Sequence, residues 1–257
     1  MRSKRIASAV LLAMLALLMP AASSQSSSSA KSPLVAPAQV SPFLRPQFAA
    51  LGDRVRKAGN ERVTLHGTFT DSAGTTQAQV VIELGGKVSV TWAGRPGQQL
   101  VFDGVSSKVT GAVTNPNDLL ESLVDDLPEN LLLAGKSGIG FRLIGLKFAA
   151  AGGMCDLYDV PTRGQASMKP AAQVKRYCFD SQTALLRWVQ YFSGGTVQHP
   201  TVQHPVEVRT DFSKWINAAG QAVPGSIVRS RAGSQIFSFQ VQTAVVSPAV
   251  NDNAFGH

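Results

Sequence analysis

Residues 62–103 read RVTLHGTFTDSAGTTQAQVVIELGGKVSVTWAGRPGQQLVFD, and apolar and polar side chains alternate along much of this stretch. Apolar residues recur at every second position from Val63 to Phe69, which is the pattern of a strand with one buried face. Short turns such as Asp71-Ser72-Ala73-Gly74 and Arg95-Pro96-Gly97 separate the alternating runs. Because connections this short join only antiparallel neighbours, the segment predicts a meander of short antiparallel strands.

A leucine-rich insertion interrupts the strands. Asn115-Pro116-Asn117-Asp118 has the features of a helix start, with Asn115 as the cap, Pro116 in the first turn and Asp118 near the positive end. Apolar residues then recur at helical spacing: Leu119, Leu120, Leu123, Val124, Leu127, Leu131, Leu132 and Leu133. Pro128 marks a break, so the insertion predicts two short amphipathic helices. Helices of this kind ordinarily pack on a sheet.

Strand patterns return after Gly138 and continue to Val245, which brings the prediction to about ten or eleven strands and about three helices. The third helix precedes the meander, over Gln47–Ala58, and ends at Gly59-Asn60. A single sheet of this size must curl, since strands twist and sheet edges need protection. The fold class is therefore α+β, with a strongly curved antiparallel sheet.

The first 46 residues have a different character. Basic residues near the N-terminus precede an apolar run from Ile6 to Met19 and small residues from Ala21 to Ser24, which is typical of a cleaved secretory signal peptide. An uncleaved signal anchor is the alternative, although the run is short for a membrane span. Residues 25–46 are rich in Ser and Pro and predict a flexible tether. The predicted domains are 1–24 (signal peptide), 25–46 (tether) and 47–257 (globular domain).

Composition excludes several classes of protein. The chain has 257 residues and is 44% hydrophobic, so it is neither disordered nor collagenous. The formal net charge of +8 falls to +5 without the leader residues Arg2, Lys4 and Arg5. We therefore expect no nucleic acid among the partners, while the remaining positive charge is compatible with attraction to an anionic membrane surface.

The two cysteines fit an oxidising compartment. Cys155 and Cys178 each lie in a segment that reads as a strand, and adjacent antiparallel strands could place the two sulfurs within bonding distance. We predict a structural disulfide. A metal pair and a redox pair are the alternatives, but two thiols alone make a poor zinc site and the sequence contains no Cys-x-x-Cys.

No constellation of residues supports catalysis. The histidines are His66, His199, His204 and His257, and neither a His-Glu-x-x-His motif nor a Gly-x-Ser-x-Gly motif occurs. His199 and His204 lie in the duplicated loop TVQHPTVQHP (196–205). We expect this loop to be exposed to solvent, rather than its histidines to form a metal site. We expect Asp125 and Asp126 to face solvent rather than form a catalytic pair. The sequence thus predicts no catalytic residue, no metal and no cofactor.

The order of elements and several short segments resemble the LolA/LolB-like superfamily, whose members include periplasmic lipoprotein carriers and related exported lipid-binding proteins. The segments that carry the resemblance are LVFDG (100–104), YCFD (177–180) followed by 183–192, residues 211–215 followed by AGQAVP (219–224), and VNDNAF (250–255). The resemblance implies an incomplete antiparallel barrel with an apolar concave face and helices that cover its opening as a lid.

Applied to this chain, the resemblance suggests residues for the wall and the lid. The wall candidates are Val63, Leu65, Phe69, Val81, Val90, Trp92, Phe102, Leu186 and Trp188, and the lid candidates within 119–133 are Leu119, Leu123, Leu127 and Leu131. Which strand face points inward stays open, because both faces of several strands are apolar. The family also places an arginine before an aromatic residue in an early strand, where it helps to hold the lid. The aligned pair here is Thr91-Trp92, so that contact does not carry over.

These observations predict an exported, periplasmic, non-catalytic protein that carries or senses a lipid or acylated lipoprotein in an apolar cavity gated by the lid. Full secretion is the alternative location. The alternative function is a structural or interaction protein of the cell envelope, whose barrel is filled by its own side chains and which docks a protein or membrane-surface partner.

Overall fold

A computed structural model describes residues 44–52, 61–83, 86–129, 142–150, 153–162, 173–193, 205–249 and 253–255. These residues all belong to one compact unit, Leu34–His257. The predicted signal peptide, most of the predicted tether, Leu131 and the loop that carries His199 and His204 lie outside the described residues.

In the described part of the chain, twelve strands form one antiparallel sheet, and two more form a small hairpin. The sheet strands are β1 (Glu61–Asp71), β2 (Gly74–Glu83), β3 (Lys87–Trp92), β4 (Gln99–Phe102), β5 (Ser107–Thr110), β6 (Arg142–Ala150), β7 (Gly153–Thr162), β8 (Gln173–Asp180), β9 (Leu186–Ser193), β10 (Val206–Ser213), β13 (Ser226–Arg231) and β14 (Ser234–Pro248). The hairpin strands are β11 (Ile216–Ala218) and β12 (Gln221–Val223).

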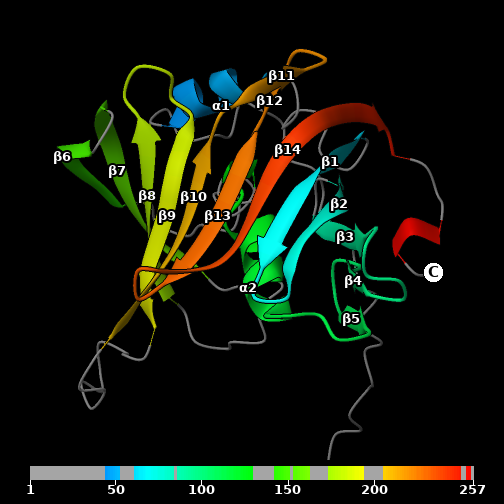
Figure 1. Ribbon diagram of the computed structural model, residues 1–257. Coiled ribbons are helices and arrows are strands. Elements are labelled where there is room, and N and C mark those ends of the chain that lie inside the picture. Colours follow the sequence, from blue (N-terminus) through cyan, green and yellow to red (C-terminus); the bar gives the residue numbers. More distant parts are fainter. Residues whose placement is uncertain are drawn as a thin grey trace, which may run out of the picture. The chain divides into compact units, whose positions relative to one another are not determined.

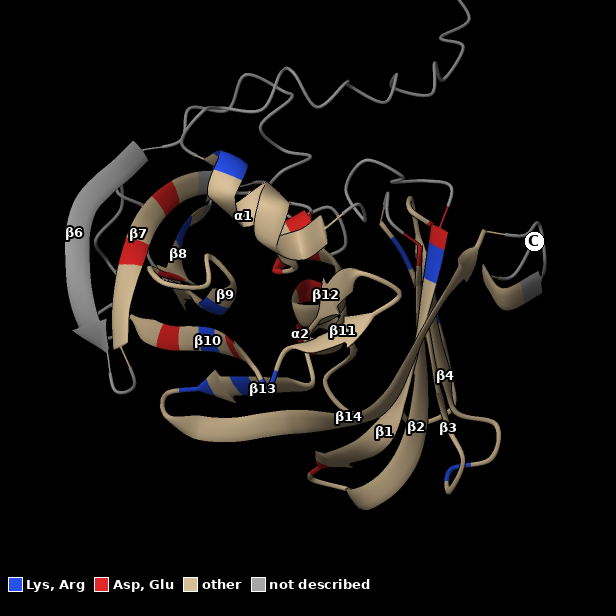
Figure 2. Cartoon of the chain, turned by 90° about the horizontal axis from the view of Figure 1, so that it is seen from above, with Lys and Arg blue, Asp and Glu red and all other residues tan. Residues whose placement is uncertain are grey.

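The sheet consists of two meanders joined through its middle. Its strand order is β5-β4-β3-β2-β1-β14-β13-β10-β9-β8-β7-β6, so the predicted early meander is confirmed and the later strands also pair mostly with their chain neighbours. The exceptions are the pairing of β10 with β13, between which the small hairpin lies in sequence, and the pairing of β1 with β14, which joins the two ends of the domain. Figures 1 and 2 show that the sheet curves strongly, and its edge strands β5 and β6 do not pair with each other. The sheet is therefore an open, curved half-barrel, as predicted.

A bulge lies in the central pair of strands. The register between β1 and β14 shifts between His66 and Gly67. A Cβ atom on Gly67 would lie 2.1 Å from the Gln240 carbonyl oxygen, so only glycine allows the two backbones to approach this closely. Bulges increase the local twist of a sheet, which helps this one to curl around its inner face.

The helices are short, and two of them lie on the concave side of the sheet (Figure 2). Helix α1 (Arg45–Leu51) begins two residues before the predicted helix, and residues 53–60 are outside the described part. Helix α2 (Pro116–Leu120) begins where the sequence predicts, although Asn115 adopts a left-handed conformation and makes no side-chain cap bond. A π-helical turn, η4 (Glu121–Asp125), continues α2, and the 3-10 turn η6 (Asn253–Phe255) lies near the C-terminus.

The disulfide prediction is confirmed. Cys155 on β7 and Cys178 on β8 are bonded, with their Cα atoms 5.3 Å apart. Both are buried with Leu157 and Trp188 in a small cluster separate from the main core. Because successive side chains of a strand point to opposite faces, Cys178 lies on the face opposite to Tyr177 and Phe179, which belong to the main core. The disulfide therefore links the strands on the outer face of the sheet.

The structure also contains elements that the sequence did not predict. Strands β5, β11 and β12 are only three or four residues long, too short for a periodic pattern to be recognised. On the outer face, Phe255 packs against Val81 and Val101 and lies under the charged groups of Arg62 and Lys87. Among the described helices, none has the length and apolar character needed to cross a membrane.

Candidate functional site

The inner face of the half-barrel is apolar over strands β1 to β4. Side chains that alternate along these strands point inward and are almost completely buried: Val63, Leu65 and Phe69 on β1, Val80 and Ile82 on β2, Val88, Val90 and Trp92 on β3, and Leu100 and Phe102 on β4. Phe69 contacts Trp92 edge-to-face with ring centroids 5.7 Å apart. The structure thus decides the strand parity that the sequence left open.

Residues 116–129, which we call the inner helical segment, cover this apolar face. Leu119, Leu123 and Leu127 are buried in the same cluster as the wall residues, together with Leu120 and Val124. Of the wall candidates, Leu186 joins this cluster, but Val81 lies on the outer face beside Phe255 and Trp188 lies with the disulfide. The structure therefore brings most of the wall and lid candidates together and separates these two from them.

The inner helical segment also carries buried carboxylates, which the sequence analysis did not anticipate. Asp126 is 0% exposed, so the expectation that it faces solvent was wrong, whereas Asp125 is half-buried. Glu121 and Asp118 are buried as well. A carboxylate buried in this way needs cationic or hydrogen-bonding partners.

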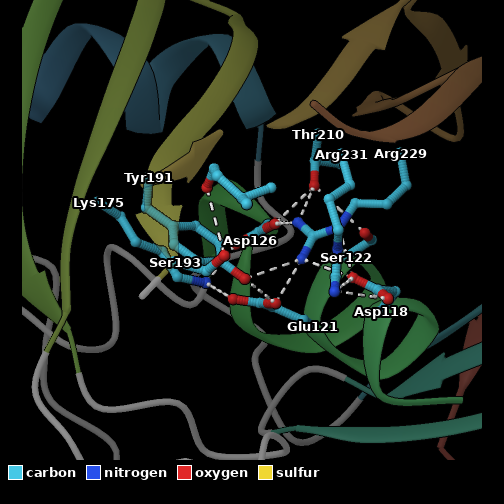
Figure 3. Close-up of polar contacts among 11 residues, drawn as sticks. Asp118, Glu121, Ser122, Asp126, Lys175, Tyr191, Ser193, Thr210, Arg229 and Arg231 are labelled. Atoms are coloured by element: carbon cyan, nitrogen blue, oxygen red, sulfur yellow. Dashed lines mark hydrogen bonds and ion pairs between the residues drawn. The ribbon is translucent and has the colours of Figure 1, made fainter. Parts of the chain in front are cut away.

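The partners of these carboxylates come from four neighbouring strands of the sheet. Lys175 on β8, Tyr191 on β9, Thr210 on β10 and Arg229 on β13 all point inward at the segment (Figure 3). Thr210 and Arg229 are directly opposite each other in the ladder. The apolar inward neighbours of these residues belong to the main core: Tyr177, Phe179, Val189, Phe212 and Ile227. On each of these strands, a polar residue interrupts the otherwise apolar series of alternate residues that face inward. This interruption is the sequence signal that could have identified the network.

Lys175 and Arg229 make the central ion pairs. The Lys175 Nζ atom lies 2.5 Å from Asp126 Oδ1 and 2.8 Å from Glu121 Oε1. Arg229 donates through Nη1 to Asp126 Oδ2 at 3.0 Å and through Nη2 to Glu121. Both cations therefore contact the same two carboxylates, and both are almost fully buried, with Lys175 1% and Arg229 0% exposed.

The π-helical turn explains why both carboxylates face the same cations. Glu121 and Asp126 are five residues apart, a spacing that would separate them by roughly 140° around an α-helix. Here the Asp126 amide donates to the Glu121 carbonyl at 2.8 Å, the wide hydrogen bond of a π-turn. The wider turn brings the two side chains to the same side of the segment.

Hydroxyl groups and a second arginine complete the network. The Thr210 hydroxyl donates to Asp126 Oδ2 at 2.6 Å, and the Tyr191 hydroxyl donates to Glu121 Oε2 at 2.7 Å. Arg231, whose side chain is 46% exposed, contacts Asp118 at 3.1 Å. Among the described residues, three cations (Lys175, Arg229 and Arg231) thus meet three carboxylates (Asp118, Glu121 and Asp126). The charges of the network balance.

The electrostatics favour the ionised forms. Burial by itself would raise the pKa of Glu121, but the charges of Lys175 and Arg229 outweigh it and lower that pKa to about 2. Burial would likewise lower the pKa of Lys175, and the carboxylates of Asp126 and Glu121 raise it instead. Glu121 and Lys175 are therefore both charged at neutral pH.

This depressed pKa predicts a specific acid sensitivity. Since the pKa of Glu121 falls from 4.5 to about 2 on folding, its stabilising effect is complete above pH 4.5 and is lost as the pH falls towards 2. Replacing Glu121 with Gln should flatten the decrease in unfolding free energy over this range, as measured by urea denaturation at several pH values. The control is Asp159→Asn, because Asp159 pairs with the exposed Arg176 at the surface. Identical pH profiles for wild type and Glu121→Gln would contradict the prediction.

A separate contact anchors the chain just before the inner helical segment. The Thr114 hydroxyl donates to Asp71 Oδ2 at 2.6 Å, and Arg95 makes a two-pronged ion pair with Asp71 at 2.7 and 2.8 Å. Asn115 follows with a φ of 48°, a conformation uncommon for a residue other than glycine. The segment therefore starts from a fixed point on the β1–β2 turn.

Solved structures of similar fold are known. The chain resembles the crystal structure of a LolA superfamily protein from Nitrosomonas europaea with a TM-score of 0.52 and 10% identity, over 82% of this chain and 97% of that one. A DUF1329 family protein from Desulfovibrio piger has a TM-score of 0.46 and 10% identity, over 82% and 95% of the two chains. No protein-family model and no curated protein sequence matches the chain. The first of these likenesses establishes the fold.

Proposed function

Because this chain has a LolA-like fold, we propose that it is an exported, non-catalytic binding protein of the bacterial envelope that carries or senses a lipid or acylated ligand. Acyl chains would bind the apolar inner face of β1 to β4 after the inner helical segment moves away as a lid. Each methylene that leaves water contributes about 0.8 kcal/mol to such binding. We place the protein in the periplasm, with the predicted signal peptide directing its export.

The observation that carries this proposal is the two-sided attachment of the inner helical segment. Its leucines cover an apolar sheet face, and its carboxylates are held by Lys175 and Arg229 through polar contacts. Acyl chains could replace the leucines on the sheet, and water could solvate the carboxylates once the segment has moved. Both sets of contacts can therefore be exchanged without breaking any strand pairing.

A second function is supported by the same packing. Leu119, Leu123 and Leu127 already fill the inner face that β1 to β4 present, as expected for a self-filled barrel. Such a protein would act as a structural or interaction component of the envelope and would bind a protein partner rather than a lipid.

One experiment separates the two functions. The mature protein is purified natively from an envelope fraction and analysed by native mass spectrometry with organic extraction. A carrier yields a stoichiometric lipid or acylated peptide, and replacing Leu123 and Leu127 with Ser changes the amount retained, because the lid then covers the inner face less well. Val109→Ser is the matched control, since Val109 is exposed on the edge strand β5. If the wild-type protein is purified without a lipid or acylated peptide and does not bind an apolar dye, the result would favour the self-filled barrel.

A further inference from the structure

The wall behind the inner helical segment carries a pair of fixed positive charges. Lys175 and Arg229 belong to β8 and β13, so they stay with the sheet when the segment moves. The rings and hydroxyls around them also belong to the sheet: Arg229 and Lys175 lie 5.6 and 5.3 Å from the Tyr191 ring centroid, and Arg229 donates to the Thr210 hydroxyl at 2.8 Å. The pair is thus built into the wall and does not depend on the lid.

Moving the segment removes the negative charges that balance this pair. Asp118, Glu121 and Asp126 all lie within the segment, and they provide the carboxylates that Lys175 and Arg229 contact. Two cations would then remain on a largely apolar wall, and their other polar contacts among the described residues are with hydroxyl groups. An unpaired charge in such surroundings is costly, so the open state favours a new anion at this place.

Unpartnered polar groups on the same inner face point to a ligand with a polar end. Tyr177 precedes Phe179 in the inward row that begins at Lys175, and its hydroxyl is buried without a hydrogen-bond partner in the described part of the chain. The Trp92 Nε1 atom, 4% exposed on β3, has none either. Buried polar groups are usually paired, so these two donors are available to a polar group of a bound molecule.

From these observations we propose that the ligand of the open half-barrel is an anionic amphiphile, whose oxyanion binds Lys175 and Arg229 in place of the Glu121 and Asp126 carboxylates. The inner helical segment then mimics the ligand twice, with leucines in place of acyl chains and carboxylates in place of the acidic head. This inference rests on the proposed lipid-binding function and specifies its ligand class. Carboxylate and phosphate heads share the required chemistry, since both accept charge-assisted hydrogen bonds from lysine and arginine.

The test compares two probes that differ only in charge. The mature full-length protein is titrated at pH 8 with the fluorescent fatty acid cis-parinaric acid and, separately, with its methyl ester. The acid should bind at least about tenfold more tightly, since charge-assisted hydrogen bonds are involved. The preference should largely survive 0.5 M NaCl because the cations are buried. Equal affinities would overturn the inference while leaving the proposed function intact. No binding of either probe, even by Leu123→Ser, would overturn both.

Variants locate the binding site, and competitors show whether the anion that it binds is the head of an amphiphile or a free anion. Lys175→Met should lower the preference for the acid severalfold, whereas Lys87→Met, a lysine of the outer face beside Phe255, should leave it unchanged. An unchanged preference in Lys175→Met would overturn the assignment to this pair. Dodecyl phosphate should displace the bound acid, and inorganic phosphate at the same concentration should not. If inorganic phosphate displaces the bound acid as well as dodecyl phosphate does, the site binds free anions, and the amphiphile proposal is overturned.

Discussion

Replacing Arg229 with Met should lower the free energy of unfolding by about 3–5 kcal/mol, because removing one partner of a buried ion pair leaves the other charge uncompensated. Arg229 contacts Asp118, Glu121 and Asp126, and among the described residues Lys175 would remain as the single cation in contact with the last two. Urea denaturation followed by far-ultraviolet circular dichroism at pH 7 measures the change.

Arg231 provides the matched control for this variant. It is an arginine on the same strand that contacts the same inner segment through Asp118, but its side chain is 46% exposed. An exposed ion pair contributes about 0–1 kcal/mol, so Arg231→Met should have a small effect. Adding Asp126→Asn to Arg229→Met should recover part of the lost stability, because it removes the excess negative charge of the network. Equal losses for Arg229→Met and Arg231→Met would contradict the role given to burial.

Replacing Cys155 and Cys178 together with Ala should lower the free energy of unfolding by about 3 kcal/mol in the chain-entropy model. The disulfide closes a loop between residues 23 positions apart and joins neighbouring strands β7 and β8. Both sulfurs are fully buried beside Leu157 and Trp188 on the outer face, so the substitution also removes packing there.

Reducing agent provides the control for the disulfide. The double alanine variant should have the same unfolding free energy with and without dithiothreitol. The wild type, unfolded and refolded under reducing conditions, should approach the stability of the variant. A difference of less than about 1 kcal/mol between wild type and variant would show that this loop constrains the unfolded chain much less than its length implies.

The disulfide and the buried ion pairs of Arg229 and Glu121 lie on opposite faces of one sheet. The disulfide stabilises the outer face of β7 and β8, while Lys175 on β8 holds the inner helical segment from the inner face. Loss of the disulfide should therefore affect the stability of the whole domain. Loss of the ion pairs should affect the position of the segment as well, and with it the ligand binding that we propose for the inner face.

Features that depend on neighbouring residues could be predicted from the sequence. The alternation between Val63 and Phe69 and the turn at Asp71–Gly74 defined the first hairpin, because side-chain period and turn type are local properties. Two further predictions also used local signals. The helix start at Asn115-Pro116 follows from the backbone preferences of these residues, and the bond between Cys155 and Cys178 follows from two strand segments that are adjacent in sequence.

Features that depend on distant residues were decided only by the tertiary structure. The inward face of each strand became known from the packing of the inner helical segment, since Leu123 shares one buried core with wall residues such as Phe69. Asp126 was expected in solvent because an acidic residue between leucines is normally exposed on an amphipathic helix. Its burial is possible because Arg229, 103 positions away, and Lys175, 49 positions away, lie on the wall opposite it. A local pattern identifies a charge, but whether that charge is buried depends on the partners that the fold places around it.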